Sequence, residues 1–132
     1  MTSIGAMIRR EIAPEDEVAH AQFLAERFDE IWIVEDLPFA GGISQLAMVL
    51  AATEDVVVGH GIAPAPFRNP AALAMEWGTL ERMFPGRVRC GLGVLSGQVV
   101  DSAHGWSVDG GVVSMMVVGV EEVVKGGGSF FV

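Results

Sequence analysis

Short apolar runs and amphipathic segments alternate through the first 93 residues, and this alternation limits the possible folds more than any other feature. The apolar runs begin near residues 4, 31, 56 and 88, which gives a repeat of about 25–32 residues. Each run has the length and composition of a buried strand, and apolar residues at helical spacing follow each of the first three. Strands and helices that alternate in this way form a parallel sheet with right-handed crossovers.

Local signals support a helix after each of the first three strands. Pro14 stands where a helix can begin, because its missing N–H would be unpaired there. Three acidic residues follow it in the first turn, where the helix dipole favours negative charge. Each segment also carries an apolar stripe for one buried face. The stripes are Val18, Ala21, Leu24, Ala25 and Phe28, then Ile43, Leu46, Ala47, Leu50 and Ala51, then Leu73, Ala74, Trp77, Leu80 and Phe84.

Two α/β architectures fit this pattern, a doubly wound open sheet and the first part of a (β/α)₈ barrel. Periodicity alone does not choose between them, but in both the ligands bind at the carboxyl ends of the strands. The residues at these ends are Arg9, Arg10, Glu11, Glu35, Asp36, His60, Gly91 and Gly93.

Several of these residues have both a functional and a structural interpretation. Glu35 and Asp36 can act as acid–base or hydrogen-bonding groups, or they can cap a helix or lie in a solvated turn. If either carboxyl group lies against an apolar wall, we expect desolvation to raise its pKa. His60, between two glycines, can border a flat ligand or sit in a β-bulge with its ring satisfied by a carbonyl. Arg68 can contact an anion or clamp its own loop to a carboxylate such as Glu76.

Charge and cysteine content exclude several classes of function. With 8 Lys and Arg against 17 Asp and Glu, the net charge is −9, so we expect neither a nucleic-acid nor an anionic-membrane partner. No apolar run approaches the roughly 20 residues that span a bilayer, and we see no signal peptide. Cys90 is the only cysteine, and no histidine has metal-ligand spacing, so we expect no disulfide and no metal site. We therefore expect a cytoplasmic protein.

The composition changes sharply after Gly93. Residues 94–132, called the tail below, contain 12 Val and 8 Gly but one Ala, whereas the first 93 residues contain 14 Ala and all six Pro. We therefore expect a domain over residues 1–93 and a divergent tail. A frameshift in a longer reading frame would explain the change, and a genuine tail with one or two β-segments in residues 112–124 is the alternative.

Six short blocks, in matching order and spacing, are similar to segments of the luciferase-like monooxygenases. This superfamily includes bacterial luciferase, other flavin-dependent monooxygenases and deazaflavin-dependent reductases. The blocks are Phe-Asp-Glu-Ile-Trp-Ile-Val-Glu-Asp (28–36), Leu-Ala-Ala-Thr (50–53), Val-Gly-His-Gly-Ile (58–62), Arg-Asn-Pro (68–70), Thr-Leu-Glu-Arg-Met-Phe-Pro-Gly-Arg (79–87) and Gly-Leu-Gly (91–93).

The resemblance implies a (β/α)₈ barrel, of which this chain would form the first half with about four βα units. It also implies FMN or coenzyme F420, bound with the ring at the carboxyl end of the barrel. The cofactor-binding residues that it implies are Glu35, Asp36, Gly59, His60, Gly61, Ile62, Gly91 and Gly93, with Arg68 as a substrate or anion contact. It assigns no general base and no metal ligand.

The implied activity is hydride transfer or oxygen insertion on a small organic substrate, with the protein positioning and desolvating the ring. We expect this chain to be a fragment of such an oxidoreductase. The alternative is a non-catalytic half-barrel that binds a partner or a flavin without turnover, because its open parallel edges and apolar face would favour a homo-oligomer.

Overall fold

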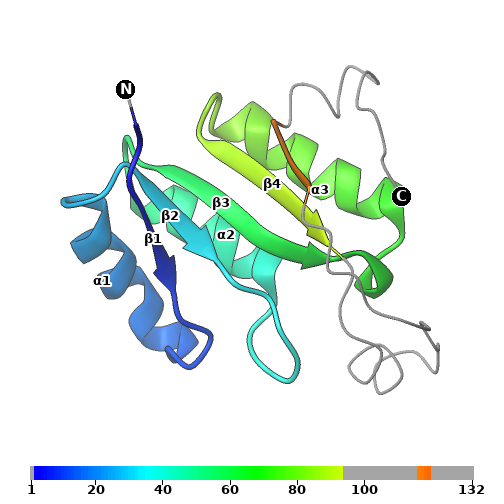
Figure 1. The fold of residues 1–132 in the computed structure, drawn as a ribbon, viewed down its shortest axis with the longest axis horizontal. Helices are drawn as coiled ribbons and strands as arrows, with labels where there is room; N and C mark the ends of the chain where they lie inside the picture. Colours follow the sequence, from blue (N-terminus) through cyan, green and yellow to red (C-terminus); the bar gives the residue numbers. More distant parts are fainter. Residues whose placement is uncertain (1, 94–115, 120–132) are drawn as a thin grey trace.

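A computed structural model of the chain describes residues 2–93 and 116–119 (Figure 1). The elements run in the order β1 (Gly5–Ile8), α1 (Pro14–Ala25), β2 (Glu30–Ile33), α2 (Gly42–Ala52), β3 (Val57–Pro64), the 3₁₀ helix η1 (Ala65–Phe67), α3 (Pro70–Met83), β4 (Val88–Gly93) and β5 (Met116–Gly119). The expected four strands and three helices are therefore present, each within a few residues of its predicted place.

The strands form one sheet in the order β1-β2-β3-β4-β5 (Figure 1). The first four strands are parallel, as the alternation of strands and helices predicts, and β5 pairs with β4 in the antiparallel sense. The register between β3 and β4 shifts between His60 and Ala63, which marks a bulge in β3. The rest of the tail lies outside the described residues.

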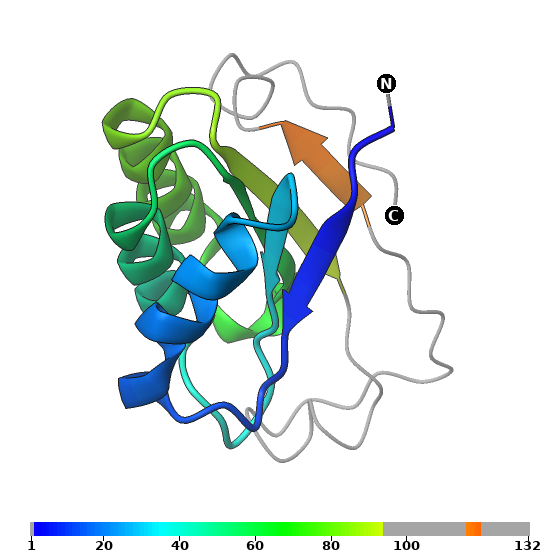
Figure 2. The same cartoon turned by 90° about the vertical axis from the view of Figure 1, so that its left-hand side faces the viewer.

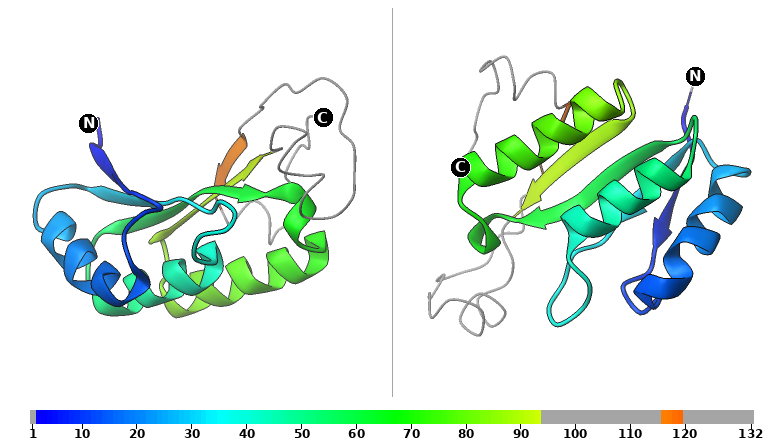
Figure 3. Two further views of the ribbon diagram at one scale, coloured as in Figure 1. Left: turned by 90° about the horizontal axis from the view of Figure 1, so that it is seen from below. Right: turned by 180° about the vertical axis from the view of Figure 1, so that it is seen from behind.

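The three α-helices all lie against the same face of the sheet (Figures 2 and 3). Because side chains alternate along a strand, every second residue of β2, β3 and β4 points into this helical layer. The core there consists of buried strand residues, including Ile31, Ile33, Val58, Val88 and Cys90, packed against helix residues such as Leu46, Leu50, Trp77 and Leu80.

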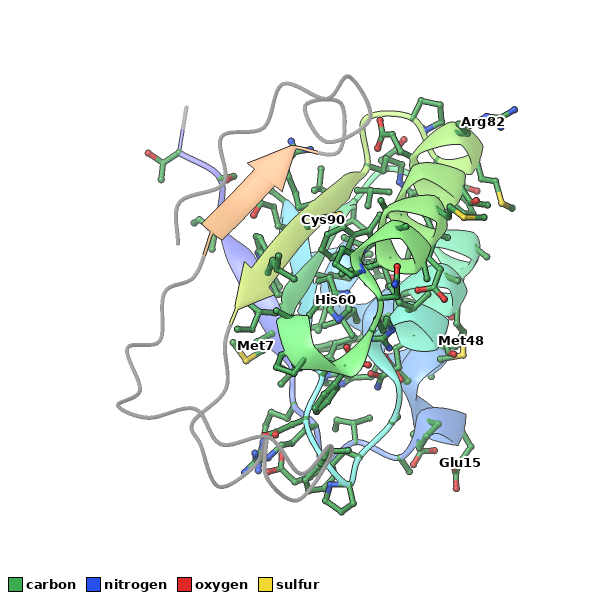
Figure 4. All side chains as sticks on the ribbon, turned by 90° about the vertical axis from the view of Figure 1, so that its right-hand side faces the viewer. Met7, Glu15, Met48, His60, Arg82 and Cys90 are labelled. Carbon is green, nitrogen blue, oxygen red and sulfur yellow. The ribbon has the colours of Figure 1, made fainter. Side chains whose placement is uncertain are left out.

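The residues between them in sequence point to the opposite side of the sheet, called the far face below. It carries Met7, Trp32, Gly59 and Arg89 in one row across the four parallel strands. Figure 4 shows His60 and Cys90 between the sheet and the helices, and Met7 away from the helices. Met7 is 60% exposed, whereas Ile31, Ile33 and Val58 on the helical side are fully buried.

Candidate functional site

The carboxylate of Glu35, just after β2, is the centre of a buried polar network. Arg68 donates two hydrogen bonds to it, from Nη1 to Oε2 at 2.7 Å and from Nη2 to Oε1 at 2.5 Å. The backbone N–H of Gly42, the first residue of α2, donates to Oε1 at 2.9 Å. His60 Nε2 lies 3.1 Å from Oε2. Four donors therefore converge on one carboxylate whose side chain is 5% exposed.

His60 is fully buried, and both of its ring nitrogens have partners. Its Nδ1 lies 3.3 Å from the indole Nε1 of Trp77, and the two rings meet edge to face. Since the indole nitrogen can only donate, Nδ1 accepts, and this bonding pattern assigns the proton to Nε2, which donates to Glu35. The expected bulge is present, but the ring is satisfied by Trp77 and Glu35 rather than by a carbonyl.

Charge and hydrogen bonding determine the ionisation of Glu35. Burial alone would raise its pKa, but hydrogen bonds from His60, Arg68 and Gly42 outweigh burial and lower the pKa to about 2. The sequence-based expectation of a raised pKa is therefore wrong for Glu35, because that expectation counted desolvation and not the donors. Glu35 is an anion at neutral pH and is not suited to giving up a proton as a general acid.

Arg68 makes the clamp that the sequence analysis offered as its structural interpretation. Its main partner is Glu35, which lies just after the neighbouring strand β2. Arg68 Nε also lies 3.7 Å from Oε2 of Glu76, the carboxylate named as an example in that interpretation. Arg68 follows η1, and Asn69 next to it caps α3 by accepting a hydrogen bond from the N–H of Ala71. The network thus ties the end of β2 to the connection between β3 and α3.

Strand alternation explains why Glu35 and His60 meet on the helical side. Glu35 has the same parity as Ile31 and Ile33, and His60 has the same parity as Val58, so both side chains point toward the helices. The structure brings Glu35, His60 and Arg68 together in one cluster. A ligand on the far face would meet the main chain of these strands rather than the Glu35 carboxylate or the His60 imidazole.

On the far face at this level, the indole of Trp32 lies against glycines of the neighbouring strands, in the same row as Met7 and Arg89. A Cβ atom built on Gly59 would lie 2.4–2.7 Å from three atoms of the six-membered ring of Trp32, and one on Gly61 would lie 2.7 Å from Cε3. A Cβ on Gly5, in β1, would lie 3.0 Å from the indole Nε1. The glycines therefore make room for the indole, which lies over β3.

The remaining predicted residues lie along the carboxyl ends of the strands. Asp36 accepts a hydrogen bond from Arg10, which follows β1, and Arg10 also packs against the Phe39 ring with its Cζ 5.2 Å from the ring centre. Ile62 follows Gly61 through a cis peptide bond in the bulge of β3. Gly91 lies against this bulge, since a Cβ there would be 2.8 Å from the His60 carbonyl oxygen. Gly93 ends β4 beside Pro64.

Neither Gly42 nor Trp77 was among the predicted site residues, and Trp77 was predicted only as part of an apolar stripe. The signal for Gly42 was available in the pair of glycines that precede the second apolar stripe. A Cβ on Gly42 would lie 2.3 Å from His60 Nε2, so the helix can approach the histidine only with glycine at this position.

Two further groups of residues bear on the expected chemistry. Cys90 is fully buried in β4, and burial raises the pKa of its thiol, which favours the unreactive neutral form. Within residues 2–93 and 116–119, no three His, Cys, Asp or Glu side chains are grouped so that they could hold a metal ion. In the same ranges, no helix is long and apolar enough to cross a bilayer.

Several solved structures share this fold, among them the following three. The oxygenating constituent of 3,6-diketocamphane monooxygenase from Pseudomonas putida, in complex with FMN, superposes with a TM-score of 0.71 at 16% identity over 96% of this chain. Coenzyme F420-dependent tetrahydromethanopterin reductase from Methanopyrus kandleri gives 0.65 at 24% identity over 76%. Apo-MsnO8 gives 0.63 at 20% identity over 83%. The four parallel strands and three α-helices therefore have the fold of the first half of a (β/α)₈ barrel.

The chain spans 29–38% of the length of these three structures. It is also 34% identical over 71 residues to the uncharacterized protein YddN of Bacillus subtilis, covering 50% of this chain and 21% of that protein. The sequence model of the luciferase-like monooxygenases matches residues 1–112 of the 132. The chain belongs to the luciferase-like monooxygenase family.

Proposed function

We propose that this chain supplies the first four strands and three helices of the barrel of a flavin- or deazaflavin-dependent oxidoreductase, and that the redox ring lies at the carboxyl ends of β2 and β3 on the far face. In a (β/α)₈ barrel the helices form the outer ring, so the far face is the barrel interior. The observation that carries the proposal is the Trp32 indole, which lies against Gly59 and Gly61 beside this rim. A planar ring needs a surface where few side chains project toward it.

The described residues fit the ring of such a cofactor. Main-chain groups around Gly59, Gly61 and Ile62 would border it, and Gly91 and Gly93 would border it from β4. The bound ring would supply hydride transfer, or oxygen insertion through its reduced form. The arginines that end β1 and precede α3 already pair with carboxylates, Arg10 with Asp36 and Arg68 with Glu35, so we do not assign the cofactor phosphate to either.

The polar network would position the rim without touching the ring. Glu35 joins β2, α2 and the segment before α3 through charge-assisted hydrogen bonds, which are about twice as strong as neutral ones. Asp36, with 24% of its side chain exposed, is the acid that we propose to meet polar atoms of the ring or of a small-molecule substrate. Glu35 and His60 would act as positioning residues.

Equilibrium dialysis of the purified chain against FMN, F420 and riboflavin tests this proposal. We expect the chain to retain at least one of the three, and riboflavin to measure the ring contribution alone because it lacks a phosphate. Turnover of the retained cofactor in its reduced form, followed by absorbance, then distinguishes an oxidoreductase from a binding module. If none of the three is retained by a chain that is folded by circular dichroism, the proposal is wrong.

A second candidate is a non-catalytic half-barrel that binds a partner. Parallel sheets are normally covered on both faces, whereas the described helices cover one face and Met7 is 60% exposed on the other. A second half-barrel, including a second copy of this chain, would cover it. Light scattering after size-exclusion chromatography tests this candidate: a stable dimer without flavin turnover favours it, and a monomer argues against self-association.

A further inference from the structure

We propose that the indole of Trp32 is the floor on which the planar ring stacks, so that this side chain is a specificity-determining contact for flat heteroaromatic ligands. The inference rests on the proposed function and deepens it. It differs from the usual role of an inward-facing barrel residue, which is to fill the barrel interior.

The first observation is that the indole is laid over the sheet rather than packed into a core. Three ring atoms, Cε3, Cζ3 and Cδ2, lie within 2.7 Å of the position that a Cβ atom of Gly59 would take. In-plane contact with the ring edge would bring one of these atoms much closer than its neighbours, so near-equal distances place Gly59 against the flat side of the ring. One side of the indole therefore rests on the glycines, and the opposite side faces the barrel interior.

The second observation is that the indole orientation is fixed. Its Nε1–H donates to Glu30 Oε2 at 3.1 Å, and the hydroxyl of Ser3 donates to Glu30 Oε1 at 3.1 Å. The Nε1 edge of the indole lies next to Gly5 of β1, and its six-membered ring lies over Gly59 and Gly61 of β3. A stacking surface that is ordered before binding loses little conformational entropy when a ligand arrives.

The third observation is the position of the indole relative to the rim. Trp32 pairs in register with Gly59, yet its ring reaches Gly61, two residues closer to the carboxyl end of β3. The ring thus extends toward the strand ends where the cofactor is proposed to lie.

Flavin fluorescence tests the inference directly. An indole in contact with an excited flavin quenches its emission by donating an electron that then returns, and this requires near contact. Riboflavin and FMN would be titrated into the W106F chain, since Trp106 lies outside the described residues, and into the same chain with Trp32→Leu or Trp32→Phe. We expect strong quenching of bound flavin in W106F and recovered emission in the Leu variant.

Affinity gives a second, independent measurement. An aromatic pair contributes binding free energy beyond that from buried area. We therefore expect Trp32→Leu to bind flavin with a dissociation constant about three- to tenfold higher than that of the parent chain. Trp32→Phe keeps an aromatic ring and is expected to recover most of the affinity. Circular dichroism and the urea midpoint establish that both variants fold.

The outcomes separate this inference from the proposed function. Retention of flavin in dialysis with unquenched emission and equal affinity for all variants would overturn the stacking role of Trp32 and leave the proposed function standing. Failure of the folded wild-type chain to retain FMN, F420 or riboflavin would overturn both.

Discussion

Replacement of Arg68 by methionine should destabilise the domain strongly, because it would leave the buried carboxylate of Glu35 without its charged partner. In Arg68→Met, Glu35 keeps the N–H of Gly42 and His60 Nε2 but loses both hydrogen bonds from the guanidinium. Breaking a fully buried ion pair costs about 3–5 kcal/mol. Since 21% of the Arg68 side chain is exposed, we expect about 2–4 kcal/mol. For a domain of this size this lowers Tm by about 10–25 °C.

A double-mutant cycle with Glu35→Gln isolates the interaction from the two side chains themselves. Urea unfolding at pH 7, followed by circular dichroism, would give the free energies of unfolding for the wild type, both single variants and the double variant. We expect the double variant to lose about 2 kcal/mol less free energy of unfolding than the two single variants lose together. In the double variant both charged groups are absent, so no charge of this pair is left without its partner. Additive losses would refute the view that the buried pair, rather than side-chain packing, ties β2 to α3.

Acid titration of the same variants provides the matching pH test. The pKa of Glu35 falls from the ordinary 4.5 to about 2 in the folded chain, so its stabilising contribution is complete above pH 4.5 and disappears as the pH falls toward 2. For a carboxylate that is 5% exposed, this shift corresponds to about 3 kcal/mol. In Arg68→Met the pKa of Glu35 should rise, and the loss of stability should therefore begin at a higher pH than in the wild type.

Other contacts lead to three more predictions. Gly42→Ala would place a methyl group 2.3 Å from His60 Nε2, so the urea midpoint of this variant should drop by an amount equivalent to about 1–3 kcal/mol. Gly41→Ala is the control: a Cβ atom at Gly41 would have nothing within 4 Å, so the urea midpoint should stay nearly unchanged. Burial raises the pKa of Glu17, whose Oε1 has no hydrogen-bond partner. The contribution of Glu17 to wild-type stability should therefore fall as the pH rises above 4.5, and Glu17→Gln should remove this dependence of the free energy of unfolding on pH between pH 4 and 8. If the tail arises from a frameshift, an alternative reading frame of the coding DNA should continue the family pattern after the codon for Gly93, and its failure in both frames would favour a genuine tail.

Strand and helix positions were predictable because they depend on local sequence. Pro14 and Pro70 each occupy the first position of a helix, and β4 has the predicted limits of Val88 and Gly93. The strand predicted over residues 56–58 instead extends from Val57 to Pro64. The bulge at His60 was one of the two interpretations that its flanking glycines allowed, and pairing with β4 keeps the strand in the sheet beyond it to Pro64.

Side-chain directions at the rim were harder to predict, because they require knowing which face of a strand is buried. The run Ile31–Trp32–Ile33 has no polar alternation, so it offers no sign of the buried face, although continuing the parity of Ile33 leads to Glu35. The donors to Glu35 could not be predicted from such local patterns, because Arg68 lies 33 residues away and meets it only through the parallel pairing of β2 and β3.

The two faces of the same strands separate stability from ligand binding, and this makes the proposed function testable in parts. Glu35, His60 and Arg68 lie on the helical side, where their removal should change the free energy of unfolding first. Trp32 lies on the far face, where Gly59 and Gly61 of β3 leave room for its indole, so its replacement should change flavin binding more than folding. A ligand bound to the network itself would reverse this order: Arg68→Met would then abolish binding in chains that remain folded, and Trp32→Leu would leave it intact.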